Sequence, residues 1–495
     1  MNARTSRNVA DLVRAAAEAT PDKAALVFHG ASTTWAELDT QVSALARGLQ
    51  GRDLKPGDRV AVHLGNTPAF VVTYFAVLRA GFVALPLNTG YTAAELDHVL
   101  TDSGAALVVT GPATAATAAE VARVPVVVTG TPEWEALPVP GDPLTAAGSG
   151  EDLAVLLYTS GTSGQPKGAM LTHRALLANL EQTALIDPPV VSADDVVLLV
   201  LPLFHVFGLN AALGSVARHG ATAVLVERFD PVDTLGEIRR YGVTNVVGAP
   251  PMYVAWSMLP DVGDAFTSVR LALSGAAPLP PNVLHRVLDV TGHHVFEGYG
   301  LTETAPVLTT TLMSEVAKAG SIGRPVPGVE LRLLDERGRP VEDGDPGEIV
   351  VRGANLFSGY WPDGADGPDA DGWFATGDVA VADAGGDLHL VDRRRELILV
   401  SGFNVYPREV EDVLARLDGV AEAAVLGIPH PYTGESVKAL VVLAPGAQLT
   451  ADEVIAHCAR SLARFKCPTA VEFMAELPHS ATGKVAKGRL RELSG

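Results

Sequence analysis

Short apolar runs alternate with segments of helical spacing through the first part of the chain. Apolar runs at 59–64, 82–87, 106–110 and 124–129 have the length of buried strands, and runs with helical spacing at 69–79 and 113–123 lie between them. Strands that alternate with helices predict α/β layers with parallel strand pairing. The proline- and glycine-rich stretch 132–150 predicts a surface connection.

The same alternation continues to about residue 304. Further strands are expected at 196–201, 221–226, 243–247 and 269–274, and the stretch 196–213 is expected to be a buried strand followed by a loop. Ligands bind outside the carboxyl ends of the strands in open α/β sheets. The segments that follow these runs, at 202–210, 275–279 and 297–304, are therefore expected near a ligand.

The pattern changes after residue 395. Residues 407–417 have the spacing of an amphipathic helix that begins with a proline. Strands are expected at 420–428 and 437–443, and a helix at 451–462, which together make a compact α+β unit of normal domain size. A chain of 495 residues is too long for one core. We therefore predict a large α/β domain over 1–394 and a small α+β domain over 395–495.

The chain is acidic, with 37 Lys and Arg against 57 Asp and Glu and a net charge of −20. This charge argues against nucleic acid or an anionic membrane as a partner. The most apolar stretch, 196–213, is interrupted by a proline, a histidine and an asparagine, so no integral membrane association is expected.

The cysteines and the first residues bear on the compartment. Cys458 and Cys467 match neither a disulfide framework nor a zinc pattern, and are expected to be free thiols in a reducing compartment. The N-terminal residues have no signal-peptide apolar core. A cytoplasmic protein is expected, and the sequence leaves monomer and homodimer open.

The most informative stretch is 158–168, Tyr-Thr-Ser-Gly-Thr-Ser-Gly-Gln-Pro-Lys-Gly, directly after an apolar run. Its glycines allow close approach of the backbone to a ligand, its backbone N–H groups can point together at an anion, and Lys167 adds a positive charge. The stretch is not a Walker A loop, because Pro166 precedes the lysine and Gly168 follows it. A phosphate-binding loop is favoured over a flexible surface loop.

Three further carboxylate or lysine positions are weaker signals when taken singly. In 297–304, Glu-Gly-Tyr-Gly-Leu-Thr-Glu-Thr, Tyr299 can stack on a base and Glu303 can bind Mg²⁺, but a turn with a solvated glutamate explains the motif nearly as well. Asp378 fits a ribose-binding carboxylate and a turn aspartate about equally. Lys484, beside a glycine near the C-terminus, reads alone as a solvated lysine.

Together these motifs resemble those of the adenylate-forming superfamily of acyl-CoA synthetases, peptide-synthetase adenylation domains and luciferases. The resemblance runs from about residue 10 to about 490 and rests on five motifs in the family's order: 158–168, Tyr-Gly-Leu-Thr-Glu at 299–303, Thr-Gly-Asp at 376–378, Asp-Arg-x-x-Glu at 392–396, and the tail with Lys484. It implies two half-reactions: a carboxylate attacks the α-phosphorus of ATP, and a thiol, usually coenzyme A, then displaces AMP.

The resemblance also implies a role for each matching residue. The ATP-binding set would be Thr159, Ser160, Gly161, Thr162, Ser163, Gly164, Lys167, Ser274, Gly275, Ala276, Glu297, Gly298, Tyr299, Gly300, Asp378 and Arg393. Mg²⁺ would bind Thr159 and Glu303. The catalytic set would be Lys484, Glu303, Thr302 and His205, with Lys484 acting in the first half-reaction only. The resemblance further implies a large multi-sheet N-terminal α/β domain and a small, mobile C-terminal α+β lid domain. The lid would turn about Arg395, and Ser401, Gly402 and Phe403 would line the coenzyme A tunnel.

The substrate implied is an apolar carboxylic acid, because Phe-His-Val-Phe-Gly-Leu at 204–209 would wall the acyl pocket. His205 is equally a pocket gate or a packing residue. A medium- or long-chain fatty acid is expected, with an aryl acid as the alternative, and a carrier-protein phosphopantetheine could replace coenzyme A as acceptor. Arg395 and Ala375 depart from residues common in the family, which leaves the kinetics of the lid open.

Overall fold

The computed structural model describes residues 7–148, 150–159, 166–314, 318–342, 344–393, 396, 398–400, 403–430, 434–462, 464–479 and 484–494. The chain divides into two compact units, the first formed by Met1–Glu330 with Arg352–Phe374, and the second by Leu331–Val351 with Ala375–Gly495. The domain boundary expected at 394/395 stays a prediction.

A mixed sheet is the largest element of the first unit. Its order in the described residues is β15-β14-β13-β12-β11-β9-β10-β1-β2. The strands are β1 (Ala24–Phe28), β2 (Ala31–Thr34), β9 (Val196–Leu199), β10 (Thr222–Leu225), β11 (Asn245–Gly248), β12 (Leu271–Ser274), β13 (Val295–Gly300), β14 (Val307–Thr310) and β15 (Arg324–Pro325). The run from β1 to β13 is parallel, whereas β2, β14 and β15 add antiparallel edges.

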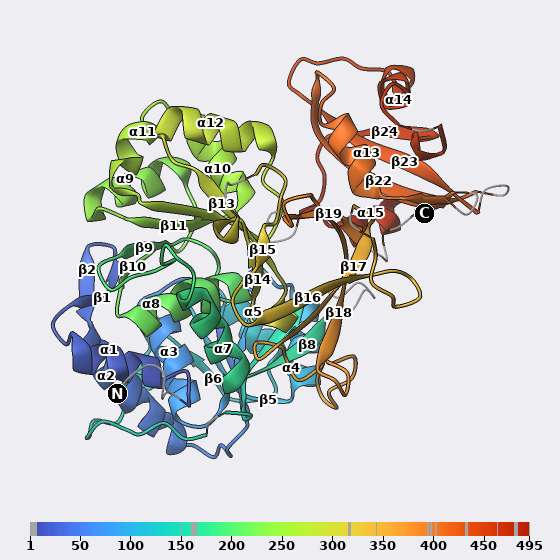
Figure 1. The fold of residues 1–495 in the computed structure, drawn as a ribbon. Coiled ribbons are helices and arrows are strands. Elements are labelled where there is room, and N and C mark those ends of the chain that lie inside the picture. The colour runs from blue at the N-terminus through green and yellow to red at the C-terminus, as the bar shows by residue number, and fades with distance from the viewer. Residues whose placement is uncertain are drawn as a thin grey trace. The chain divides into compact units, whose positions relative to one another are not determined.

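Helices cover one face of this sheet at its β11–β13 side, and Figure 1 shows them together. They are α9 (Pro231–Tyr241), α10 (Pro250–Ser257), α11 (Val262–Ala265) and α12 (Pro281–Thr291). Their apolar faces pack around the buried Trp256, Tyr253 and Phe266. The α9 helix begins where the Asp230 carboxylate accepts the N–H groups of Val232 and Asp233, which stabilises its N-terminus.

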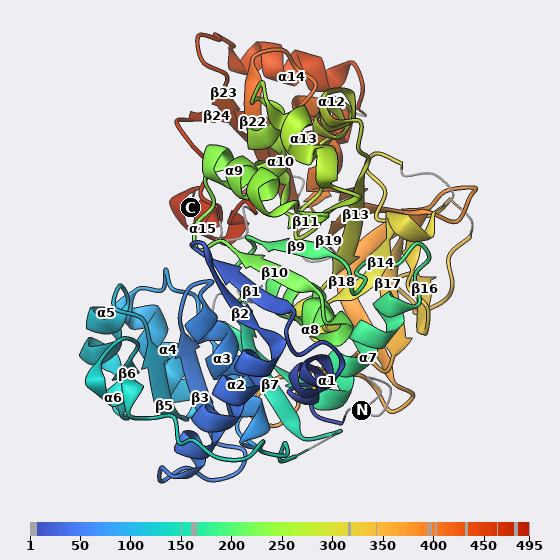
Figure 2. The ribbon, with the colours of Figure 1, turned by 90° about the vertical axis from the view of Figure 1, so that its left-hand side faces the viewer.

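A second sheet in the first unit has the order β6-β5-β3-β4-β7-β8. Its strands are β3 (Arg59–His63), β4 (Val83–Pro86), β5 (Ala105–Thr110), β6 (Val126–Val128), β7 (Leu153–Thr159) and β8 (Lys167–Thr172). All its pairs are parallel except β7 with β8. The helices α4 (Ala93–Ser103) and α5 (Ala115–Val121) pack beside β5 and β6 (Figure 2).

The remaining helices of the first unit pack around the two sheets. They are α1 (Asp11–Ala19), α2 (Trp35–Gln50), α3 (Pro68–Arg79), α6 (Pro132–Glu135), α7 (His173–Ala184) and α8 (Ser215–His219), with the π-helix η2 (Phe207–Gly214) and the short 3₁₀ turns η3 (Phe266–Ser268), η4 (Thr302–Thr304) and η5 (Thr311–Met313). Helix η2 corrects the expected loop at the end of 196–213. Its residues are almost all apolar, so the sequence carries no helical period that would have distinguished a helix from a buried loop.

The second unit holds most of the sheet β16-β17-β18-β19 and a separate α+β layer. The strands are β16 (Val329–Leu334), β17 (Gly347–Gly353), β18 (Trp373–Ala382), β19 (Leu388–Arg393), β20 (Ile398–Val400), β21 (Phe403–Val405), β22 (Val420–His430), β23 (Gly434–Leu443) and β24 (Ala470–Met474). The helices are α13 (Pro407–Leu414), α14 (Ala451–Ala459) and α15 (Lys487–Ser494), with the 3₁₀ turn η6 (Arg464–Lys466).

The α+β layer has its own core. Side chains of α13 and α14 pack with those of β22, β23 and β24. Figure 1 shows these helices and strands together. Both cysteines lie in this core as free thiols, and burial, followed by the charge of Cys467, raises the pKa of Cys458 to about 11. The predicted free thiols are confirmed, and the thiol of Cys458 stays protonated at neutral pH. In the described part of the chain, no helix is long and apolar enough to cross a membrane.

Candidate active site

The phosphate-loop candidate connects two antiparallel strands. Thr159 ends β7 and stands opposite Lys167, which begins β8. The loop residues Ser160, Gly161, Thr162, Ser163 and Gly164 lie outside the described residues. The lysine is therefore fixed at the start of a strand, where a Walker A lysine would stand at the start of a helix.

Two described contacts hold the Lys167 ammonium group. Its Nζ lies 3.0 Å from Oδ2 of Asp366 and 5.1 Å from the centre of the Tyr360 ring. The lysine side chain is 44% exposed, so a ligand can reach its charge. Next to Thr159 in β7, Tyr158 donates a hydrogen bond to Asp102. Burial, and to a smaller extent this hydrogen bond, raise the pKa of Tyr158, so its hydroxyl stays protonated.

The carboxyl ends of β11 and β12 meet the middle of β13 in register. Gly248 stands opposite Ser274, and Ser274 opposite Glu297. The buried Ser274 Oγ has no hydrogen-bond partner among the described residues. The next residue, Gly275, has no room for a side chain, because an added Cβ would lie 2.7 Å from Cε1 of Phe207. Ala276 then takes a positive φ of 69°, a strained conformation typical of ligand-binding loops.

Glu297 holds the loop at 275–279 through its side chain. Its carboxylate accepts the N–H of Leu279 at 2.9 Å, and its own N–H donates to Oγ1 of Thr311 at 2.8 Å. The side chain is buried. The structure therefore gives Glu297 a clear part in shaping the 275–279 loop, and direct contact with ATP stays a prediction.

The Tyr299–Glu303 segment turns sharply after β13. Gly298, Tyr299 and Gly300 pair with β14, and an added Cβ at Gly300 would lie 1.7 Å from the Pro306 carbonyl oxygen, so the chain requires glycine there. Thr302 and Glu303 lie in η4, and Glu303 is only 9% exposed.

Glu303 is held on two sides by one neighbouring segment. The hydroxyl of Tyr360 donates to Oε1 of Glu303 at 2.5 Å, and the N–H of Phe357 donates to the Glu303 carbonyl oxygen at 2.9 Å. The sequence motif left a solvated turn glutamate open. Burial and a short, charge-assisted hydrogen bond now argue against that alternative.

His205 is half-buried in the turn before η2. Its Nδ1 accepts the N–H of Phe207 at 3.2 Å, so the proton of the neutral ring lies on Nε2. π-Helices frequently occur at functional sites. The structure places His205, Phe207 and Gly275 together. The role of 204–209 as an acyl wall stays a prediction.

The second unit carries the remaining candidates. Asp378 is 6% exposed and pairs in register with Arg393, and its N–H donates to Oγ1 of Thr376 at 3.2 Å. Lys484 is exposed. Arg395, Ser401 and Gly402 lie outside the described residues, as do the side chains of Arg393 and Phe403, so their roles stay predictions.

The residues of the first unit fit a nucleotide and Mg²⁺. The buried Ser274 hydroxyl has no hydrogen-bond partner among the described residues, and Gly275 and Gly300 have no room for a side chain. No group of three or more His, Cys, Asp or Glu that could hold a metal occurs in the described residues. In proteins, Mg²⁺ usually binds one or two carboxylates and takes its other oxygens from phosphates and water. Glu303 and Thr159 can supply the protein ligands.

Two further residues of this region carried no sequence signal. Tyr360 contacts Glu303 from 57 positions away in the chain. Asn66, buried after β3, accepts the N–H of Leu203 at 2.9 Å and donates to the Leu201 carbonyl oxygen at 2.8 Å, so it fixes the chain just before 204–209. Such long-range contacts leave no periodic pattern in the sequence.

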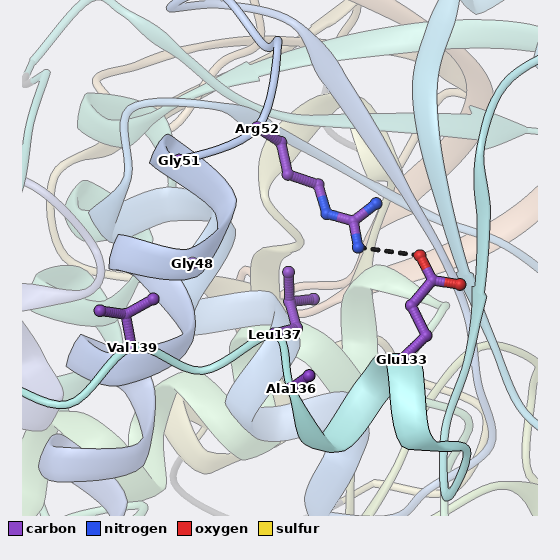
Figure 3. Close-up of a pocket in the computed structure, with 7 residues that line it drawn as sticks. All are labelled: Gly48, Gly51, Arg52, Glu133, Ala136, Leu137 and Val139. Atoms are coloured by element: carbon purple, nitrogen blue, oxygen red, sulfur yellow. Dashed lines mark hydrogen bonds and ion pairs between the residues drawn. The ribbon is translucent and has the colours of Figure 1, made fainter.

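A surface pocket lies away from these residues, between the end of α2 and the segment after β6. It is lined by Gly48, Gly51, Arg52, Glu133, Ala136, Leu137 and Val139, and Arg52 pairs with Glu133 across it at 2.9 Å (Figure 3). None of the predicted site residues lines it. The close packing of Gly48 on the Leu137 carbonyl oxygen indicates a structural contact between α2 and the following chain.

Comparison with known proteins now decides the family. The family described as AMP-binding enzyme matches residues 13–361, and its C-terminal domain matches 409–484. This chain belongs to the AMP-binding enzyme family, the adenylate-forming acyl-CoA synthetases. The ligase is 39% identical to a feruloyl-CoA synthase of Amycolatopsis sp over 97% of both chains. It is 35% identical to a long-chain-fatty-acid–CoA ligase of Bacillus subtilis over 95% of this chain and 92% of that one.

Solved structures agree with this assignment. ATP-bound MatB from Rhodopseudomonas palustris superposes with a TM-score of 0.91 at 34% identity, covering 100% of the ligase and 99% of that chain. A benzoate CoA ligase from Burkholderia xenovorans superposes with a TM-score of 0.87 at 29% identity over 98% of the ligase and 99% of that chain. The predicted family, the α/β fold with a smaller C-terminal α+β domain, and the acid–thiol ligase class are confirmed. The ligase uses ATP to form an acyl-adenylate, with coenzyme A as cosubstrate.

Proposed function

We propose that the ligase converts an apolar monocarboxylic acid into its coenzyme A thioester, with an aromatic propenoic acid such as ferulate as the first candidate. The observation that supports this proposal is the close approach of the Phe207 ring to Gly275, within the segment 204–209 that we propose as the acyl wall. The other residues of 204–209 are apolar, apart from one histidine. A flat aromatic acid suits such a wall.

The choice of acid reverses the order expected from the sequence. The 39% identity to a feruloyl-CoA synthase supports the aromatic acid, and the 35% and 36% identities to long-chain-fatty-acid–CoA ligases support a medium- or long-chain fatty acid as the second candidate. Both classes share the chemistry that follows.

The proposed first half-reaction joins two anions, so the charge must be neutralised on both sides. The acid's carboxylate attacks the α-phosphorus of ATP, the bond to the β-phosphate oxygen breaks, and pyrophosphate leaves. Lys167 and the 159–164 loop hold the β- and γ-phosphates, and Thr302 binds the α-phosphate. Glu303 and Thr159 would hold Mg²⁺, which would neutralise phosphate charge. Lys484 bridges the carboxylate and the α-phosphate.

In the second half-reaction, the thiol of coenzyme A attacks the acyl carbonyl carbon, and AMP leaves. We propose that the lid turns about Arg395 between the two steps and that Ser401, Gly402 and Phe403 line the thiol's path. Asp378 and Arg393 hold the ribose through both steps. A carrier-protein phosphopantetheine is the alternative acceptor, because the chemistry of its thiol is the same.

A pyrophosphate-release screen tests the substrate. Ferulate, benzoate, decanoate, palmitate and malonate are each supplied with ATP and Mg²⁺, and kcat/KM is compared. Ferulate should give the highest value and malonate none. A higher kcat/KM for decanoate or palmitate would favour the fatty acid, and activity with malonate would contradict the apolar wall. Adding coenzyme A or a carrier protein to the accumulated adenylate then identifies the acceptor.

A further inference from the structure

The segment from Phe357 to Asp366 forms an additional strand-like edge beside β8. The N–H of Met170 donates to the Gly359 carbonyl oxygen at 3.1 Å, and the N–H of Ser358 donates back to the Met170 carbonyl oxygen at 3.0 Å. The N–H of Trp361 donates to the Gly168 carbonyl oxygen at 2.8 Å. The segment is therefore fixed to the strand that Lys167 begins.

The same segment also holds the glutamate expected to bind Mg²⁺. Phe357 bonds the backbone of Glu303, and the Tyr360 hydroxyl bonds its carboxylate at 2.5 Å. The Tyr360 ring is itself fixed by the buried Phe357 ring, edge to face, with centroids 5.1 Å apart. Tyr360 cannot swing away from Glu303 without breaking this packing.

The ring of Tyr360 meets the second charged group of the site. The Lys167 ammonium lies 5.1 Å from the ring centre, within the range of a cation–π contact. One side chain thus contacts two groups of opposite charge, a carboxylate at its hydroxyl and an ammonium at its ring.

We propose that Tyr360 is a positioning residue that aligns Glu303 for Mg²⁺ and Lys167 for the phosphates of the same nucleotide. Its hydroxyl donates to Oε1 of Glu303, which would leave Oε2 for Mg²⁺. Its ring supports the ammonium of Lys167. This inference rests on the proposed function, because it assumes that Mg²⁺ and the phosphates of ATP bind here.

The Tyr360→Phe variant separates the two contacts, because it removes the hydroxyl and keeps the ring. A hydrogen bond to a charged group contributes enough that the half-saturating Mg²⁺ concentration should rise by roughly 10-fold to 100-fold. Saturating Mg²⁺ should restore the rate of pyrophosphate release, and KM for the acid should not change.

Tyr241→Phe is the matched control. The buried Tyr241 hydroxyl has no hydrogen-bond partner in the described part of the chain, and the Arg240 guanidinium lies 5.2 Å from its ring. The control removes the same atom beside a cation, at the end of α9, which carries none of the proposed site residues. Its Mg²⁺ dependence should match that of the wild type.

Pyrophosphate binding, measured by isothermal titration calorimetry, gives a readout that does not depend on turnover. In EDTA, Tyr360→Phe should bind pyrophosphate as the wild type does, whereas Tyr360→Leu should bind it about 2-fold to 5-fold more weakly, because it has lost the ring beneath Lys167. With Mg²⁺ present, both variants should bind it more weakly than the wild type. Circular dichroism and thermal unfolding check that each variant is folded.

Two results would overturn the inference. One is an Mg²⁺ midpoint for Tyr360→Phe within twofold of the wild type. The other is a folded Tyr360→Phe that loses activity at every Mg²⁺ concentration, which would indicate a structural role. If the wild type neither binds Mg²⁺ with ATP nor releases pyrophosphate with any acid, the proposed function itself fails. That failure is seen in the wild type alone, whereas failure of the Tyr360 inference is seen only when the variants are compared with the wild type.

Discussion

Replacing Gly275 with alanine tests whether the end of β12 and the start of η2 shape the acyl site together. An added Cβ would lie 2.7 Å from Cε1 and 2.9 Å from Cζ of Phe207. Carbon atoms pack at about 3.5–4.0 Å, so the ring must withdraw by roughly 0.8 Å or more. The backbone of η2 cannot yield easily, because Gly208 is already packed on the Pro202 carbonyl oxygen.

Overpacking of this kind costs about 1–3 kcal/mol, which corresponds to roughly 5-fold to 150-fold in an equilibrium constant. We expect the displaced ring to narrow the acyl site. The kcat/KM of the Gly275→Ala variant should therefore fall by roughly 10-fold or more for ferulate, and by less for a smaller acid such as butyrate.

The assay is pyrophosphate release with the two acids in a double-mutant cycle with Phe207→Leu. Shortening residue 207 removes the atoms that the new Cβ would meet, so Gly275→Ala should cost under about 0.5 kcal/mol in that background. Gly236→Ala is the matched control, because Gly236 lies in α9 with nothing within 4 Å of its added Cβ. It should be neutral or slightly stabilising.

Equal losses from Gly275→Ala with and without Phe207→Leu would refute the reasoning. Such a result would mean that the clash with the ring is not the cause. Equal losses for both acids would separately contradict the assignment of Phe207 to the acyl wall.

Three further predictions concern charge. Lys484→Ala should abolish acyl-adenylate formation but leave thioester formation from supplied acyl-adenylate largely intact, and equal loss in both rapid-quench assays would contradict its assigned role. Asp366→Asn should tighten pyrophosphate binding up to about 5-fold by calorimetry, because it removes a 68% exposed carboxylate that competes with pyrophosphate for Lys167. The control Asp261→Asn breaks a comparable surface ion pair with Arg239 and should leave pyrophosphate binding unchanged. Weaker pyrophosphate binding by Asp366→Asn would contradict this competition. Burial lowers the pKa of His173 to about 4, so the unfolded chain takes up the proton first and the free energy of unfolding should fall by about 3 kcal/mol as pH drops from 6.5 towards 4. Urea unfolding at several pH values should show this fall reduced in His173→Gln, and an unchanged pH slope would exclude His173 as its source.

Most strands of the parallel core could be predicted because both of their faces are buried. The runs at 59–64, 82–87, 243–247 and 269–274 became β3, β4, β11 and β12 with shifts of a few residues at their ends. A strand buried on both faces is apolar at every position, which is a strong local signal.

The antiparallel edges could not be predicted in the same way. β2 reads Ala-Ser-Thr-Thr, with no large apolar residue, and β14 reads Val-Leu-Thr-Thr, with only two apolar residues in a row. Neither stretch is long enough to show a strand period. Their pairing depends on neighbours that the chain supplies elsewhere. The expected helices at 407–417 and 451–462 likewise formed but ended early, at Leu414 and Ala459.

The candidate site shows the same division. The motifs identified the family and pointed to Lys167, Glu303 and Lys484, because catalysis requires particular residue types at close spacing. Nothing in the motifs distinguished a solvated Glu303 from the buried, hydrogen-bonded one that the structure shows.

The sequence by itself determined which chemical groups this protein can bring to a nucleotide, because a glycine-rich loop, a lysine and a carboxylate are local features of the chain. It also determined the parallel core, because a strand that is buried on both faces consists of consecutive apolar residues. Only the tertiary structure decided how those groups are held. Tyr360 meets Glu303 and Lys167, and Phe207 meets Gly275, across long separations in sequence. These contacts depend on packing between elements, and no local pattern of residues encodes such packing.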